Sequence, residues 1–386
     1  MKPATVPLRI VSLACLLVLS ACGGGGEDEA ESSASIDVAQ DVSQAETDKT
    51  SSLLAPQDDS SAWGDAEGTL AGVQDTLAAD SSSSLMVTMA AAAATPTTAQ
   101  RVAAAGATAQ SSTNACSKVR PFYWEIGARD GKLAGGGVGS AAVKPATAIS
   151  VASASKWLYG AYVAQSRGGA LSSSDRKYLA MSAGYGSLVN CSGFASVDAC
   201  LASGRNGAYT AGLDGVFKYN GGHMEKHASL MGLGALSTKA LANEVRAKLG
   251  SDIALAYSQP LLAGGAVIST NTYAAFLRKI LAGKLQIANQ LGSGKVCTNP
   301  ATCPRAVFAP SPDNESWNYS VGHWVEDDPK VGDGAFSSPG AFGFYPWIDA
   351  RKAFYGIVAR VQEDGGQGSV SCGRLIRAAW ASGVAK

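Results

Sequence analysis

The chain of 386 residues is poor in histidine and in charge, and these shortages exclude several kinds of site. It has only three histidines, so a serine–histidine–acid triad would have to use one of them, and no G-x-S-x-G nucleophile elbow is present. No C-x-x-C spacing supports a metal centre. Between His223 and His227 the glutamate stands one place too late for the H-E-x-x-H pattern of metalloproteases, so we expect no metal. No cluster of lysines and arginines with interleaved aromatics occurs, so nucleic acid is not an expected partner.

The residues that are present suit one large globular domain behind a long leader. The chain is 46% hydrophobic, which is ample for a sizeable core. Residues 1–96 hold 14 acidic and 3 basic residues, so the remaining residues hold 17 acidic and 28 basic ones, a net charge of +11. This asymmetry is explained by solvation of an acidic tether, or alternatively by attraction of the basic body to anionic polymers of the cell envelope.

The N-terminus has the pattern of a secretory signal. Lys2 and Arg9 precede the apolar run 10–19, which is too short to span a membrane. The following segment, Leu-Ser-Ala-Cys-Gly, resembles a bacterial lipobox, which implies removal of residues 1–22 as a lipoprotein signal peptide and diacylation of Cys22. Ordinary cleavage without a lipid is the alternative. We expect anchoring to a membrane in the cell envelope facing the periplasm, and the outer membrane if the cell is Gram-negative, because Gly23 is not the aspartate associated with inner-membrane retention.

Residues 23–96 form the predicted tether. They are rich in serine, alanine and acidic residues, and they are poor in aromatics. Such a segment cannot bury enough apolar surface to offset the entropy of ordering, so we expect it to be disordered. The folded domain should therefore span residues 97–386.

The cysteines agree with export. Cys15 lies in the signal, and six cysteines remain after Cys22, which allow fifteen pairings. Two pairs are close in sequence, Cys191 with Cys200 and Cys297 with Cys303. Cys116 and Cys372 are then left together.

Strand patterns lie at both ends of the body and helical patterns lie between them. Residues 122–128 and 132–139 predict a hairpin, and residues 354–361 predict a late strand before a closing helix over 373–382. The middle, about 170–292, is predominantly helical in pattern. This order predicts an α+β fold in which an antiparallel sheet made from both termini is flanked by helices and carries an inserted all-helical lobe.

The string Ser153-Ala154-Ser155-Lys156 carries the chemistry. It reads S-x-x-K at the start of a predicted helix over 150–165, and residues at i and i+3 share one helix face. A serine hydroxyl becomes a good nucleophile when a neighbouring base takes its proton. Lysine can be that base where burial or nearby positive charge lowers its pKa.

Four segments in order resemble one known family. Residues 149–168 are similar to the nucleophile helix of serine β-lactamases and penicillin-binding proteins, closest to the branch of class C β-lactamases, D,D-carboxypeptidases and their esterase relatives. Residues 217–223 fall where that family has its Y-x-N motif, residues 263–270 resemble its AGG-x-x-ST segment, and residues 338–343 stand in the place of its K-T-G or H-T-G strand. The resemblance covers roughly 97–386 and implies a β-lactamase/transpeptidase-like fold. That fold sets the first strand beside the last, where Cys116 and Cys372 could meet.

The resemblance also implies roles for individual residues. Ser153 would be the nucleophile, Lys156 its base, and Tyr219 a proton relay to the leaving group. The backbone N–H groups of Ser153 and Ala341 would form the oxyanion hole. The residues expected to contact substrate are Asn220, Gly221, His223, Trp324, Ser338 and Gly340. No cofactor is needed for this chemistry, and we expect a monomer.

Two departures from the family pattern bear on the substrate. Gly221 stands where the Y-x-N amide belongs unless Asn220 takes its place, and Ser338 stands where relatives have the lysine or histidine that contacts a substrate carboxylate. We therefore predict a serine hydrolase of the carboxylesterase or amidase type, acting on a small-molecule or oligomeric ester or amide. A β-lactamase or D,D-carboxypeptidase is the first alternative. A non-catalytic envelope-binding protein of the same fold is the second.

Overall fold

The computed structural model describes residues 95–312, 315–362 and 366–386. The predicted signal peptide, the lipidation site Cys22 and all but the last two residues of the predicted tether lie outside them. Within the described part, no helix combines the length and the apolar character that crossing a bilayer requires.

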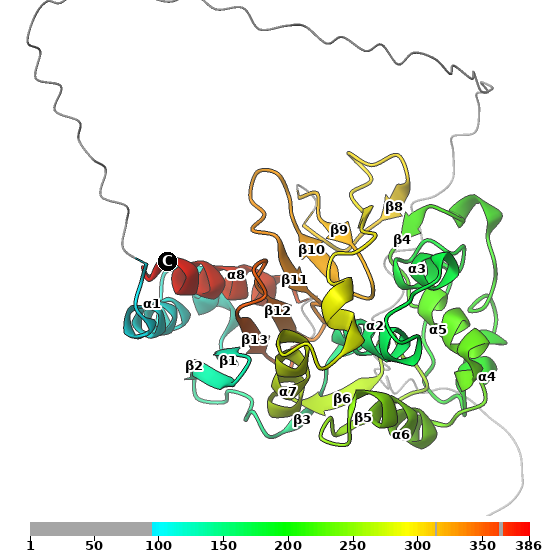
Figure 1. Cartoon of the computed structure of the whole chain (residues 1–386), viewed down its shortest axis with the longest axis horizontal. Helices are drawn as coiled ribbons and strands as arrows, with labels where there is room; N and C mark the ends of the chain where they lie inside the picture. The colour runs from blue at the N-terminus through cyan, green and yellow to red at the C-terminus, as the bar shows by residue number, and fades with distance from the viewer. Residues whose placement is uncertain (1–94, 313–314, 363–365) are drawn as a thin grey trace, which may run out of the picture. The chain divides into compact units, whose positions relative to one another are not determined.

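An antiparallel sheet of eight strands organises the domain, and strands from the early and the late part of the described chain lie side by side in it (Figure 1). The first strand pairs with the last, with Trp124 opposite Val358. Across the sheet the strands are β2 (Gly131–Val138), β1 (Phe122–Ala128), β13 (Tyr355–Ala359), β12 (Tyr345–Ile348), β11 (Ala335–Ser337), β10 (Trp324–Glu326), β9 (Asn318–Tyr319) and β7 (Val296–Cys297). The predicted α+β class with an antiparallel sheet is confirmed.

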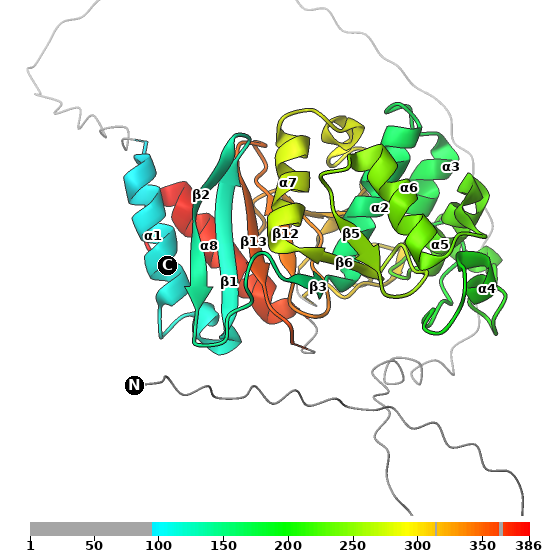
Figure 2. The same cartoon turned by 90° about the horizontal axis from the view of Figure 1, so that it is seen from below.

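Helices cover both sides of this sheet. Figure 2 shows β1, β2 and β13 between α1 (Thr98–Gln110) and α8 (Gln367–Ser382) on one side and α7 (Thr270–Leu281) on the other. A 3₁₀ helix, η1 (Ala115–Val119), precedes β1. The predicted disulfide between Cys116 and Cys372 is present, and it joins η1 to α8.

The middle of the chain forms a lobe that is largely helical. Its helical segments are η2 (Ala152–Ala154), α2 (Ser155–Ser166), α3 (Ser173–Leu179), α4 (Val197–Leu201), η3 (Ala211–Leu213), α5 (Gly222–Ala228), the π-helix η4 (Ser229–Leu233), α6 (Thr238–Leu249) and η5 (Gln286–Gln290). The lobe also carries a small antiparallel sheet of β3 (Ala148–Ser150), β6 (Ala266–Ser269) and β5 (Leu255–Tyr257). A parallel pair joins β4 (Phe217–Lys218) to β8 (Ala306–Phe308).

Helix α2 runs through the interior. Every residue from Ser155 to Ala164 is buried, so this helix is enclosed on all sides. It lies very close to the backbone before β10, since a Cβ on Gly160 would stand only 2.6 Å from the carbonyl oxygen of Val321. Gly322, with φ of +71°, closes the same contact because its own Cβ would meet the carbonyl of Lys156. Two glycines therefore let the helix that carries Lys156 touch the connection between β9 and β10 of the sheet.

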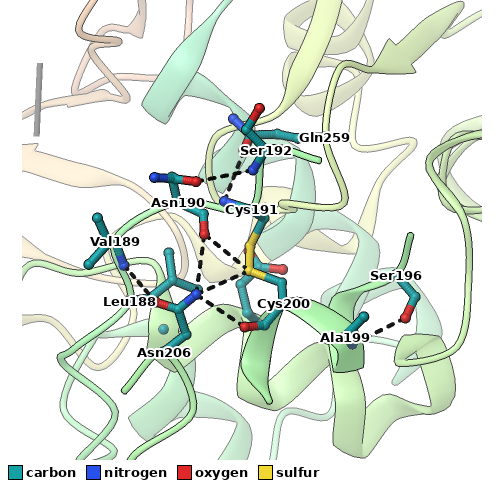
Figure 3. Close-up of a disulfide and its surroundings, with 12 residues drawn as sticks. Leu188, Val189, Asn190, Cys191, Ser192, Ser196, Ala199, Cys200, Asn206 and Gln259 are labelled. Atoms are coloured by element: carbon teal, nitrogen blue, oxygen red, sulfur yellow. Dashed lines mark hydrogen bonds between the residues drawn. A yellow bond between two sulfur atoms is a disulfide. The ribbon is translucent and has the colours of Figure 1, made fainter. Parts of the chain in front are cut away.

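A second predicted disulfide closes the segment that leads into α4 within this lobe. Cys191 and Cys200 are bonded and form a small core with Leu188 (Figure 3). The Asn206 side chain donates to the carbonyl of Cys200 and accepts from the N–H of Val189, so the loop is held at both ends. The third predicted disulfide, between Cys297 and Cys303, is also present.

The last helix is longer than its sequence pattern predicts. It begins at Gln367 rather than near Gly373. Its first turns bury small residues such as Ser369, and a side chain on Gly373 would collide with the ring of Tyr345. Small buried residues leave no apolar periodicity, which explains the difference.

Candidate active site

Ser153 and Lys156 are in hydrogen-bond contact. The Nζ of Lys156 lies 3.0 Å from the Oγ of Ser153. Ser153 is partly exposed, whereas its neighbours Ala152 and Ala154 are buried, so the hydroxyl lies at the surface of a packed turn. The S-x-x-K spacing has therefore brought a hydroxyl and an amine together as it predicts.

The turn that presents Ser153 is strained and is held from several sides. Ala152 has φ of +44°, in the left-handed region that a residue with a Cβ seldom adopts. Such a conformation costs roughly 1–3 kcal/mol and persists only where its surroundings impose it. Here the buried Oγ of Ser155 donates to the carbonyl of Ala152 and accepts from the N–H of Ala266. The phenol of Tyr273 donates to the carbonyl of Ala154. The serine is thereby fixed at the start of α2.

Lys156 is placed to act as a base. Its side chain is 5% exposed, and its Nζ also donates to the carbonyl of Ala263, at 2.8 Å. Burial lowers the pKa of Lys156 to about 7, and the charge of Glu225 acts in the opposite direction. A substantial fraction of the amine is then neutral near neutral pH. A neutral amine can take a proton from Ser153.

The ring of Tyr219 lies close to the amine of Lys156. The Nζ of Lys156 is 4.8 Å from the centre of the Tyr219 ring, and that ring stacks on Trp324 with centroids 5.3 Å apart. Burial raises the pKa of Tyr219 to about 12, while hydrogen bonding with Ser153 and Trp324 acts to lower it. The phenol is therefore protonated near neutral pH and lies next to Ser153. Trp324 is itself buried, and it also packs against the ring of Tyr319 with centroids 4.8 Å apart, so its predicted contact with substrate stays a prediction.

The segment 338–341 lies directly against the turn that carries Ser153. The Oγ of Ser338 donates to the carbonyl of Ser153 at 3.1 Å, so this hydroxyl is used within the protein. A side chain on Gly340 would collide with the carbonyl of Val151, which explains the glycine. Ala341 follows it at an exposed position, in a turn closed by the N–H of Gly343 donating to Gly340. Ala341 is thus the residue after Gly340, which touches the turn of Ser153, and its predicted part in an oxyanion hole stays a prediction.

The residues after Tyr219 are engaged in the loop rather than with Ser153. Asn220 accepts from the N–H of Leu188 and donates to its carbonyl. Gly221 packs against the AGG segment, since a Cβ there would lie 3.1 Å from that of Ala263. His223 is fully buried and its Nδ1 accepts from the N–H of Ala183. Their predicted contacts with substrate stay predictions.

Each of the three histidines is bonded to other groups of the protein. Burial lowers the pKa of both His223 and His323 to about 4, so both rings are neutral near neutral pH. His323 lies between the N–H of Gly292 and the carbonyl of Val321. His227 pairs with Asp175 at 2.9 Å. Within the described ranges, no histidine hydrogen-bonds to Ser153, and no group of three or more His, Cys, Asp or Glu side chains is arranged to hold a metal ion.

One residue near Lys156 has no counterpart in the sequence predictions. Glu225, on α5, is completely buried, and its Oε1 accepts from the N–H of Ala263 at 2.8 Å. The only sequence signal was a charged residue in a short helix shortly after Tyr219. Nothing in that pattern distinguishes a buried carboxylate from a solvated one.

Comparisons with known proteins give similar structures only. No protein-family model and no curated protein matches the sequence. Among solved structures, the chain is similar to FmtA from Staphylococcus aureus, with 12% identity over 69% of this chain and 86% of the other and a TM-score of 0.48. It is similar to a D-stereospecific amidohydrolase from Streptomyces sp., with 12% identity, coverage of 71% and 98%, and a TM-score of 0.47. Simvastatin synthase (LovD) from Aspergillus terreus has 11% identity, coverage of 70% and 97%, and a TM-score of 0.48.

Proposed function

We propose that this protein is a serine hydrolase that cleaves an ester or amide through an acyl-enzyme on Ser153. The observation that carries the proposal is the 3.0 Å contact between the Oγ of Ser153 and the Nζ of a buried lysine whose pKa is lowered to about 7. An ordinary surface lysine would be charged and could not accept a proton. Here the base and the nucleophile are already in contact.

Acylation follows from these positions. Neutral Lys156 takes the hydroxyl proton as the Oγ of Ser153 attacks the substrate carbonyl carbon. The carbonyl oxygen becomes an oxyanion, which the N–H groups of Ser153 and Ala341 would stabilise. The protonated phenol of Tyr219 gives a proton to the leaving alcohol or amine as its bond to carbon breaks, and Tyr219 is restored by the proton on Lys156. Water then hydrolyses the ester on Ser153 by the reverse order of proton transfers.

The surroundings favour a substrate without a carboxylate handle. Ser338 is neutral and its hydroxyl is already bonded to the carbonyl of Ser153. Gly221 supplies no amide, and Asn220 is held by Leu188. These features support a carboxylesterase or amidase over a β-lactamase or a D,D-carboxypeptidase, whose substrates carry such a group.

Covalent labelling tests the proposal. We expect a fluorophosphonate probe to add one mass increment to the wild type, as seen by intact mass spectrometry. Ser153→Ala should lose the label because the nucleophile is gone. Ser192→Ala, which changes an exposed serine in the Cys191–Cys200 loop, should keep it. Labelling of Ser153→Ala to the wild-type extent would contradict the assignment of the nucleophile.

The same assay separates the alternatives. Reaction with labelled penicillin at a rate comparable to that of the fluorophosphonate would support a β-lactamase or a D,D-carboxypeptidase. Absence of labelling and of turnover with a panel of esters and amides would support a binding protein that retains the fold.

We also propose that the protein is exported and lipid-anchored through Cys22, with residues 23–96 as a tether. The support is the signal pattern and the lipobox-like segment of the sequence. Labelled palmitate should enter the wild type and not Cys22→Ala. Equal incorporation into both would overturn the anchor.

A further inference from the structure

A fully buried carboxylate is connected to the proposed base, Lys156, through one residue that contacts both of them. Glu225 is 0% exposed, and the reaction proposed above assigns it no part. Burying a carboxylate without compensation is very unfavourable, so its surroundings should show what retains it. They show a connection to Lys156 through a single residue.

That residue is Ala263, the first of the AGG segment. Its N–H donates to the Oε1 of Glu225 at 2.8 Å, and its carbonyl accepts from the Nζ of Lys156 at 2.8 Å. The same Nζ contacts the Oγ of Ser153. The carboxylate therefore holds the backbone that holds the lysine against the nucleophile. A change at Glu225 would be felt at Lys156 both by displacement and by charge.

We propose that Glu225 is a positioning residue that sets the orientation and the charge state of Lys156 through Ala263. This inference rests on the proposed function for its consequence in acylation. The coupling between the two side chains stands without it.

Electrostatics support the geometric connection. Burial raises the pKa of Glu225 to about 7, and it lowers the pKa of Lys156 to about the same value. The charge of each group acts to stabilise the charge of the other. For two groups coupled through their charges, the apparent pKa values belong to the pair.

Several titratable groups surround Glu225. They are Lys156 and Tyr159 of α2, Tyr257 of β5, and His223 and His227 of α5 itself. Burial raises the pKa of both tyrosines, so they are neutral, and burial lowers the pKa of both histidines. Asp175 of α3 pairs with His227, and Asp198 of α4 lies against Gly234. Lys156 is therefore the positive charge that the Glu225 carboxylate faces.

The variant Glu225→Gln separates charge from shape. Its amide oxygen can still accept from the N–H of Ala263, while the negative charge is removed. Without that charge, protonated Lys156 loses its stabilisation, so its pKa should fall. The acid limb of the acylation rate should then move to lower pH.

The experiment measures the rate at which a fluorophosphonate phosphonylates Ser153, as a stand-in for acylation, from about pH 5 to about pH 9, for the wild type, Glu225→Gln and Glu244→Gln. Glu244 is a partly exposed glutamate that accepts from Tyr162, and it serves as the matched control. The Lys156 side-chain signal is followed over the same range by ¹³C NMR and identified by its absence from Lys156→Met. The NMR titration reports the coupling without any need for activity.

We expect Glu225→Gln to lower the midpoint of both curves by roughly one pH unit, with the plateau rate kept within several-fold, and Glu244→Gln to leave both midpoints unchanged. A uniform loss of rate without a shifted midpoint would mean a merely structural role and would overturn the inference. A shifted NMR titration in a protein that is not acylated at any pH would keep the coupling and refute the proposed function. Labelling of Ser153 with unmoved midpoints would support the proposed function and overturn the coupling.

If Glu225→Gln does not fold, the wild type still decides. The NMR signals of Glu225 and Lys156 should each show an inflection at the midpoint of the other. Independent single-step titrations would overturn the coupling.

Discussion

A buried lysine destabilises a fold, and Lys156 illustrates the cost of placing a base inside a protein. Its pKa falls from 10.5 to about 7 on folding, so between these pH values the unfolded chain binds a proton that the native chain does not. Stability from this group therefore rises with pH through that window and is lost as the pH falls toward 7. The residue that the proposed reaction needs is one that the fold would be more stable without at neutral pH.

Lys156→Met should show this directly. Its advantage in unfolding free energy over the wild type should shrink by roughly 1.4 kcal/mol per pH unit from about pH 7 to about pH 10. Urea unfolding at several pH values measures it. The same variant should lose acylation. Lys239→Met, at an exposed position of α6, serves as the control and should not change the pH slope. A difference between Lys156→Met and wild type that stays constant with pH would contradict the buried, deprotonated lysine.

At the scale of elements, α2 works because it can approach the sheet closely. Gly160 is one helical turn after Lys156, on the same face. A methyl group there would meet the backbone carbonyl of Val321, which cannot move as a side chain can. We expect Gly160→Ala to lower stability by about 1–3 kcal/mol and to slow acylation, because α2 must shift away from its partner.

Thermal unfolding and the rate of fluorophosphonate labelling measure the two effects. Gly106→Ala on α1 is the matched control, because a Cβ there meets nothing within 4 Å. Alanine is favoured over glycine in a helix interior, so this variant should gain up to about 1 kcal/mol. Equal effects of the two substitutions would show that the close approach at Gly160 is unimportant.

Elements with their own periodicity were predictable from the sequence, and close contacts were not. Residues 122–128 form β1 as predicted, because a β-branched and aromatic run bounded by a turn favours a strand. The early start of α8 was missed because Ser369 and Gly373 are small. Glu225 was missed because its burial depends on Ala263, 38 positions along the chain. Pattern indicates which local structure forms, whereas such contacts depend on tertiary packing.

At the scale of the whole molecule, the domain is closed by its two ends. The helices α1 and α8 pack together, β1 pairs with β13, and Cys116 is bonded to Cys372. The resemblance to a known fold brought these two cysteines together in the prediction, and local spacing sufficed for the other two bonds. A large part of the chain therefore lies within one covalent loop, which includes α2 and the proposed site.

This architecture predicts unequal contributions from the disulfides. The Cys116–Cys372 bond closes a loop with a sequence separation of 256, and Cys297–Cys303 closes one of 6. A cross-link restricts the unfolded chain more when its loop is longer. Removing the first pair by double alanine substitution should therefore cost roughly 3 kcal/mol more than removing the second. Urea unfolding of both double variants under oxidising conditions measures the difference. Comparable losses would mean that the bond between the termini adds little to what pairing of β1 with β13 and packing of α1 on α8 already provide.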